Sequence, residues 1–213
     1  MMPSIEINLP EFKERRLEFL DDRIVQHWPD YWLESPMAML SPWGDGPLPE
    51  VMMSWEDHLM KRHAEVVCEN GGDILEIGFG MGISATYIQE QNPKSHTIVE
   101  IHPQVLERLD VWAKDKPNVI VVKGDWHKKF QRGKLGKYDG IFYDGFGDDN
   151  YLEIGRNIKQ LSKPGAIFTF WNNLSEEANV YGLEGATYEK LPARLLENGY
   201  FTGDSYYLPK VVI

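Results

Sequence analysis

Short apolar runs alternate with amphipathic stretches over the second two thirds of the chain. The apolar runs, typical of strands buried on both faces, occupy residues 73–78, 96–101, 118–124, 138–144 and 165–171. Helical periodicity marks residues 82–91, 103–114 and 149–161, and Pro103 suits a first helical turn. Strands and helices repeating at this spacing predict an α/β fold with a doubly wound, mainly parallel sheet.

The first 50 residues follow a different pattern, so we expect them to form an N-terminal extension. Helical spacing over residues 11–28 predicts an amphipathic helix. Its apolar face would consist of Leu17, Leu20, Ile24 and Trp28. Five prolines interrupt residues 29–49, which predicts an irregular segment that closes over the body as a lid. We therefore divide the chain into residues 1–50, helix and lid, and residues 51–213, the domain that contains the sheet.

Two more helices and a terminal hairpin complete the predicted elements. One helix begins at Ser54, whose hydroxyl is expected to cap it, and runs to about Val67. The other lies near residues 187–198. After it, an antiparallel edge hairpin is expected to turn near Gly203 and Asp204.

Composition limits the kinds of binding partner and the cellular compartment that we expect for this protein. A formal net charge of -11 repels phosphate backbones and favours cations, so a nucleic-acid partner is not expected. No apolar run reaches the roughly 18 residues of a membrane span, and no signal-peptide core is present, which predicts a cytoplasmic protein that does not bind membranes. The single cysteine, Cys68, is expected to fill the core in a reducing compartment. The six histidines lack ligand spacing, so no metal is expected.

Three glycines punctuate the turn after the first predicted strand, in the sequence EIGFGMG. Gly78, Gly80 and Gly82 permit a tight strand-to-helix turn and a close approach of a ligand to the backbone. A triphosphate loop is excluded because no Gly-Lys-Ser/Thr follows. A dinucleotide loop is disfavoured because Ile83 stands where its last glycine belongs.

Acidic residues end the next two predicted strands. Glu100 would lie beside the glycine turn, where its carboxylate could accept both ribose hydroxyls of a ligand. The alternative is that Glu100 is a surface carboxylate with no ligand. Asp125 and Trp126 would border the same crevice, suited to an adenine ring and its amine, although packing explains Trp126 equally well.

At this point the chain resembles the class I S-adenosylmethionine-dependent methyltransferases, and more narrowly the guanidinoacetate N-methyltransferases and the yeast-type arginine δ-N-methyltransferases. The resemblance rests on the segments VMMSWEDHLM, ILEIGFGMGI, IVEIHPQVLERLDVWA, VVKGDWH, YDGIFYD and LSKPGAIFTFWNNLS, in the family's order. It implies S-adenosylmethionine as cofactor and a small cationic guanidino or amine compound as methyl acceptor.

The resemblance also implies roles for individual residues. Implied cofactor contacts are Met52, Met60, Glu76, Gly78, Phe79, Gly80, Met81, Gly82, Ile83, Glu100, Ile101, His102, Gly124, Asp125, Trp126 and Asp144. Implied guanidino contacts and catalytic groups are Glu56 and Asp144. The family's substrate-binding Thr-Ser pair corresponds to Leu174 and Ser175, and the loop after Asp144 is shorter than the family's.

Methyl transfer to a guanidinium requires that the reacting nitrogen be aligned with the methyl group and that a proton be removed from it. Two carboxylates, on Glu56 and Asp144, could bind the planar fork and accept that proton. Three alternatives remain: a methyltransferase for carboxylate or hydroxyl acceptors, a noncatalytic binding module with the cofactor fold, and a dinucleotide oxidoreductase. Either a monomer or a homodimer is compatible with the sequence.

Overall fold

A seven-stranded sheet forms the centre of the computed structural model, which describes residues 10–34, 50–145, 151–174, 177, 180–193, 201 and 203–213. The strand order is β6-β5-β4-β7-β8-β10-β9. The strands are β4 (Asp73–Ile77), β5 (Ser95–Glu100), β6 (Val119–Lys123), β7 (Tyr138–Tyr143), β8 (Ser162–Phe170), β9 (Thr187–Pro192) and β10 (Ser205–Val212). Strands β4 to β8 are parallel, whereas β10 runs antiparallel to both neighbours. The predicted strands and the doubly wound, mainly parallel sheet are confirmed.

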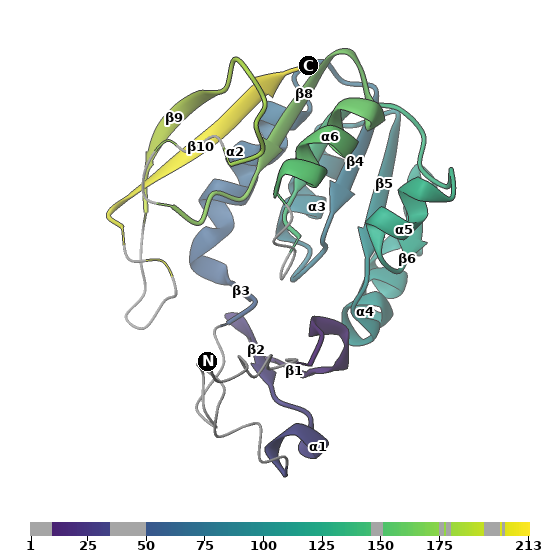
Figure 1. The fold of residues 1–213 in the computed structure, drawn as a ribbon, viewed down its shortest axis with the longest axis vertical. Helices are drawn as coiled ribbons and strands as arrows, with labels where there is room; N and C mark the ends of the chain where they lie inside the picture. Colours follow the sequence, from purple (N-terminus) through teal and green to yellow (C-terminus); the bar gives the residue numbers. More distant parts are fainter. Residues whose placement is uncertain are drawn as a thin grey trace, which may run out of the picture.

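Helices cover both faces of this sheet (Figure 1). They are α2 (Asp57–Val67), α3 (Ile83–Glu90), α4 (Pro103–Ala113), α5 (Trp126–Gln131) and α6 (Tyr151–Leu161). In the view of Figure 1, α6 crosses in front of the sheet, while α2 and α3 lie behind it. The three helices predicted between the strands are confirmed, and α5 is an additional short helix that the apolar pattern did not indicate. None of the helices in the described ranges is long and apolar enough to cross a bilayer.

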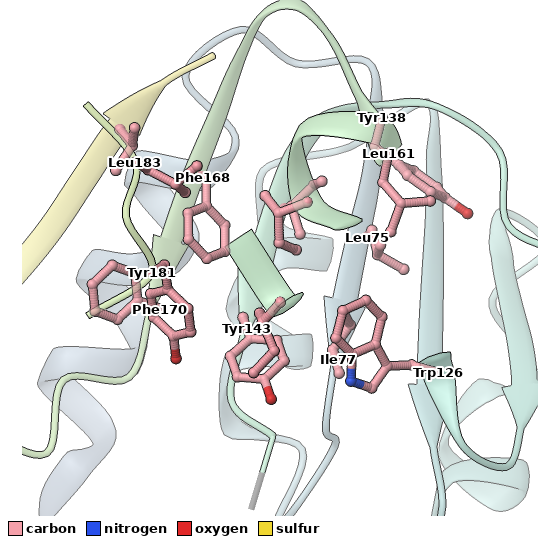
Figure 2. Close-up of a cluster of buried hydrophobic side chains, with 14 of the residues drawn as sticks. Leu75, Ile77, Trp126, Tyr138, Tyr143, Leu161, Phe168, Phe170, Tyr181 and Leu183 are labelled. Atoms are coloured by element: carbon pink, nitrogen blue, oxygen red, sulfur yellow. The ribbon is translucent and has the colours of Figure 1, made fainter. Parts of the chain in front are cut away.

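The core beneath α6 is rich in aromatic side chains. Figure 2 shows Phe168, Phe170 and Tyr181 gathered on one side of Tyr143, with Trp126 on the other. These rings meet mostly edge to face; the Phe170 and Tyr181 centroids, for example, are 4.6 Å apart. Such packing fills the space between sheet and helix and surrounds the carboxyl end of β7.

The N-terminal extension forms a small sheet and not the helix expected over residues 11–28. A 3-10 turn (Phe12–Glu14) precedes β1 (Arg16–Phe19) and β2 (Arg23–His27), which pair antiparallel. Strand β3 (Met52–Met53) adds to β2 across the expected boundary at residue 50. Leu17 and Ile24 are buried, but Leu20 is 45% exposed at the turn between the strands. The helix prediction is wrong because a seven-residue spacing of apolar groups also suits two facing strands.

Beyond β2, the short helix α1 (Asp30–Leu33) is described. Most of the expected lid, residues 35–49, lies outside the described residues.

Three further predictions need correction. A 3-10 turn (Ser54–Glu56) leads into α2, and its cap position is Met53, not Ser54. The helix expected near residues 187–198 is a strand, β9, over Thr187–Pro192. The antiparallel edge pair exists, but it joins β10 to β9, so Gly203 and Asp204 do not form its tight turn. Pairing with the edge of β10 overrides the weak helical periodicity of this segment.

Candidate functional site

A cavity of about 450 Å³ opens at the carboxyl ends of β4, β5, β6 and β7. Its walls are formed by Glu11, Phe12, Lys13, Val51, Met52, Ile77, Gly78, Gly80, Val99, Glu100, Ile101, Val105, Gly124, Asp125, Trp126, His127, Lys128, Asp144 and Gly145. The chain moves outward from β4 to β6 and then returns to place β7 on the other side of β4. The cavity therefore lies at the switch point of the sheet, where α/β proteins bind their ligands.

The glycine turn forms one wall of this cavity with bare backbone. Gly78 has φ 92°, and a Cβ built on it would lie 2.2 Å from the Asp144 carbonyl oxygen. A Cβ on Gly80 would lie 2.7 Å from the Met52 sulfur, which also accepts a hydrogen bond from the Met81 amide at 3.2 Å. A side chain at position 78 would collide with the main chain of Asp144, whereas one at position 80 would require the flexible Met52 side chain to move, so glycine lets the turn lie close to both.

Glu100 lies at the end of β5 with a carboxylate that is largely held by backbone amides. One oxygen accepts from Ile101 and His102 at 2.7 Å each, and the other accepts from Phe79 at 3.0 Å. Burial raises the pKa of Glu100, although these amides act in the opposite direction. A carboxylate offers about four acceptor positions, so capacity for a ligand hydroxyl remains. The alternative of a surface carboxylate is wrong, because Glu100 is only 5% exposed.

The turn after β6 supplies the opposite side of the cavity. Asp125 caps α5, accepting from the Lys128 amide at 3.2 Å. Trp126 packs in the core edge to face with Tyr143, at 5.8 Å between ring centroids, and also lines the cavity (Figure 2). A packing role and a ligand-facing role for Trp126 are therefore compatible, because the same residue packs in the core and lines the cavity.

Asp144 follows β7 at the base of the cavity, with its backbone amide bonded to Ile77 at 2.9 Å. The residue lines the cavity and is half-buried. Burial, reinforced by the negative charges of Glu76 and Glu100, raises the pKa of Asp144 to about 7. A carboxyl group with this pKa exchanges a proton near neutral pH, as a general base must.

Glu56 occupies the buried N-terminal end of α2 and does not line the described cavity wall. Its carboxylate accepts from the Met53 amide at 2.8 Å, which fixes it to β3. Burial raises the pKa of Tyr206 well above its ordinary value, and the charges of Asp144 and Glu56 both contribute. Both carboxylates thus act electrostatically on one hydroxyl, although they lie on separate elements.

Several residues implied by the resemblance do not line the described cavity. They are Met60, Glu76, Phe79, Met81, Gly82, Ile83 and His102. Glu76 is fully buried and accepts a hydrogen bond from the Ser84 hydroxyl, while the His96 Nε2 atom lies 2.9 Å from its other carboxylate oxygen. Leu174 is 38% exposed on the loop after β8, and Ser175 lies outside the described residues. Their roles, like the other ligand contacts, stay predictions.

One wall of the cavity has no marker in the sequence. Glu11, Phe12 and Lys13 line it from the N-terminal extension. Their segment was predicted to be helical, and no motif marks them. They reach the cavity only because the hairpin of β1 and β2 lies against the body of the protein.

Within the described ranges, no group of three or more His, Cys, Asp or Glu side chains could hold a metal. Cys68 is half-buried, and burial raises the pKa of its thiol to about 12. A thiol with this pKa is a weak nucleophile, which fits a packing role.

The sheet order and the cavity at its switch point define the Rossmann-like fold of class I methyltransferases. A solved O-methyltransferase from Bacillus cereus in complex with SAH superposes with a TM-score of 0.54 at 17% identity, covering 73% of this chain and 81% of that one. Residues 47–181 match the family model for guanidinoacetate N-methyltransferase, and the chain belongs to this family.

Among curated proteins, the chain is similar to two fungal proteins named protein arginine N-methyltransferase 2. The protein from Candida glabrata is 34% identical over 194 residues, which cover 76% of this chain and 47% of that one. The protein from Yarrowia lipolytica is 31% identical over 179 residues, covering 78% of this chain and 35% of that one. The chain therefore spans half or less of the length of these relatives. The expected family is confirmed.

Proposed function

We propose that this chain is an S-adenosylmethionine-dependent N-methyltransferase that methylates a guanidino group. The observation that carries the proposal is Asp144, a carboxyl group at the base of a glycine-walled cavity with its pKa raised to about 7. Membership of the guanidinoacetate N-methyltransferase family supports the same reaction.

The residues of the cavity fit the cofactor. The bare backbone at Gly78 and Gly80 lets the turn approach Asp144 and Met52 closely at the edge of the cavity, and Glu100 retains acceptor capacity for a ribose hydroxyl. The wall from Gly124 to Trp126 offers an aromatic face and a carboxylate to the adenine end. When bound, S-adenosylmethionine supplies an electrophilic methyl group on a positively charged sulfur.

The acceptor nitrogen needs a partner that removes its proton. A free guanidinium has a pKa above about 12, so its nitrogen lone pair is not nucleophilic at neutral pH. Asp144 would accept that proton as the carbon–nitrogen bond forms and the methyl carbon–sulfur bond breaks, with S-adenosylhomocysteine as the leaving group, because its carboxylate is destabilised by burial and by neighbouring charges. Glu56 is held by the Met53 amide outside the described cavity wall, and we assign it the remaining guanidino N–H groups, where its charge would keep the positive charge away from the reacting nitrogen.

For the acceptor we propose an arginine side chain, in a protein or peptide or as the free amino acid. The support is the similarity to proteins named protein arginine N-methyltransferase 2 and the net charge of -11, which favours a cation. A cytoplasmic location remains part of the proposal.

The test is release of S-adenosylhomocysteine with a panel of arginine peptides, basic proteins and free guanidino compounds, followed by mass spectrometry of the product. We expect turnover with at least one guanidino acceptor. The Glu56→Gln variant should chiefly raise the KM for that acceptor and leave cofactor affinity nearly unchanged. Asp139→Asn, which removes the charge from a part-buried ion pair with Lys163 at 2.7 Å away from the cavity lining, is the control. Turnover restricted to carboxylate or hydroxyl acceptors would refute the proposal.

A further inference from the structure

The hairpin of β1 and β2 is attached to the body through the first turn of α4. Strand β1 is the edge of the small sheet, so the outward N–H and C=O groups of Leu17 need other partners. The Gln104 side chain provides both: its oxygen accepts from the Leu17 amide at 2.7 Å, and its Nε2 donates to the Leu17 carbonyl at 2.9 Å. One side chain thus replaces a neighbouring strand at this position.

His102 makes a second attachment two residues earlier. Its Nε2 donates to the Arg15 carbonyl at 2.9 Å, and its Nδ1 accepts from the Gln104 amide at 3.2 Å. Both nitrogens of the neutral ring are therefore satisfied, and burial lowers the pKa of His102. The Phe12 ring lies 4.9 Å from the imidazole, centroid to centroid.

These attachments hold in place the segment that lines one wall of the cavity. The Arg15 guanidinium donates to the Pro10 carbonyl at 3.3 and 3.2 Å, which closes residues 10–15 into a loop. Within that loop, Glu11, Phe12 and Lys13 line the cavity. The loop therefore depends on contacts from residues that do not line the cavity themselves.

The same small sheet is also connected to Glu56, the carboxylate proposed to bind the acceptor. Ile24 of β2 pairs with Met52 of β3, whose sulfur lies on the glycine turn. The next residue, Met53, donates its amide to Glu56. A displacement of β1 and β2 would therefore shift Met52, which contacts the glycine turn, and Met53, which holds Glu56.

We propose that Gln104 and His102 are positioning residues that dock the N-terminal hairpin and so complete the cofactor cavity with Glu11, Phe12 and Lys13. The inference rests on the proposed cofactor but not on the identity of the acceptor. A docked hairpin raises cofactor affinity because the cavity is already formed before binding.

The experiment compares Gln104→Met and His102→Asn with the wild type. Gln104→Met keeps the length of the side chain and removes both bonds to Leu17, while His102→Asn retains an acceptor for the helix cap but loses the reach to Arg15. Asn118→Ala is the matched control, since it removes a comparable bond to the Pro93 carbonyl, at 3.0 Å, away from the cavity. Binding of S-adenosylhomocysteine is measured by calorimetry, and tryptic cleavage after Lys13, Arg15 and Arg16 by mass spectrometry.

Both variants should lose affinity, by about 10-fold for Gln104→Met, the factor that corresponds to about 1.4 kcal/mol. Cleavage in the hairpin should accelerate in both, while Asn118→Ala behaves as the wild type. Unchanged affinity in Gln104→Met, or an equal loss in Asn118→Ala, would overturn the proposal. If the wild type fails to bind, the proposed function is contradicted; the docking claim is then decided by proteolysis, and equal cleavage of Gln104→Met and Asn118→Ala overturns it.

Discussion

Replacing Asp144 by Asn should stabilise the folded protein while strongly lowering its activity. The pKa of this carboxyl is 3.8 ordinarily and about 7 in the folded chain, because burial and the charges of Glu76 and Glu100 disfavour ionisation. The neutral side chain therefore contributes its full stability below about pH 4, and this contribution is lost as the pH rises through about 7. Asparagine mimics the neutral acid and avoids the loss.

The magnitude follows from the displacement of the pKa. Moving it from 3.8 to about 7 corresponds to ~4 kcal/mol at pH 8, and partial exposure to the cavity reduces this, so we expect about 2 to 4 kcal/mol. For a chain of this length, each 1 kcal/mol raises the Tm by roughly 2–4 °C. Turnover should fall by about 10² or more, the scale of a lost general base.

Urea unfolding at pH 5.5 and pH 8 measures the effect. The gain for Asp144→Asn should be larger at pH 8. Asp73→Asn is the control of opposite sign, because hydrogen bonds from Lys163 and Ser95 lower the pKa of Asp73 to about 2. Its stabilisation is lost only below about pH 4, so this variant should be destabilised equally at both pH values. A gain in Asp144→Asn that does not change with pH, or no gain at pH 8, would refute the reasoning.

Three further predictions concern the site. The kcat/KM for the best guanidino acceptor should rise with pH through about 7, as Asp144 ionises, and a pH–rate profile that stays flat between pH 6 and pH 8 would contradict this assignment. Glu100→Ala should weaken S-adenosylmethionine binding at least about 10-fold in calorimetry and lower the Tm, because it removes a ribose acceptor and leaves three backbone amides unpaired; equal cofactor affinity would argue against the ribose role. Gly78→Ala should abolish cofactor binding, since its Cβ would lie 2.2 Å from the Asp144 carbonyl oxygen, whereas Gly136→Ala, with open space around its Cβ, should bind normally in the same titration.

The sequence alone determined the parallel half of the sheet and much of the cavity. Strands buried on both faces need continuous apolar runs, and a strand-to-helix turn with positive φ needs glycine. Because parallel strands end at one edge, the positions of Glu100, Asp125 and Asp144 after their strands predicted that they would border one crevice. These inferences depend on local pattern and on a general rule of topology, so a single sequence was sufficient for them.

Only the tertiary structure decided the form of the N-terminal extension and of β9. Leu17 and Ile24 have a spacing that suits either one helical face or two paired strands, and the choice was made by contacts distant in sequence. Gln104, 87 residues after Leu17, pairs with the main chain of β1. Strand β9 likewise exists because β10 offers it an edge. Local propensity differs little between such alternatives, so the free energy of burial and of long-range hydrogen bonds selects the fold there, and with it the wall that Glu11, Phe12 and Lys13 add to the cavity.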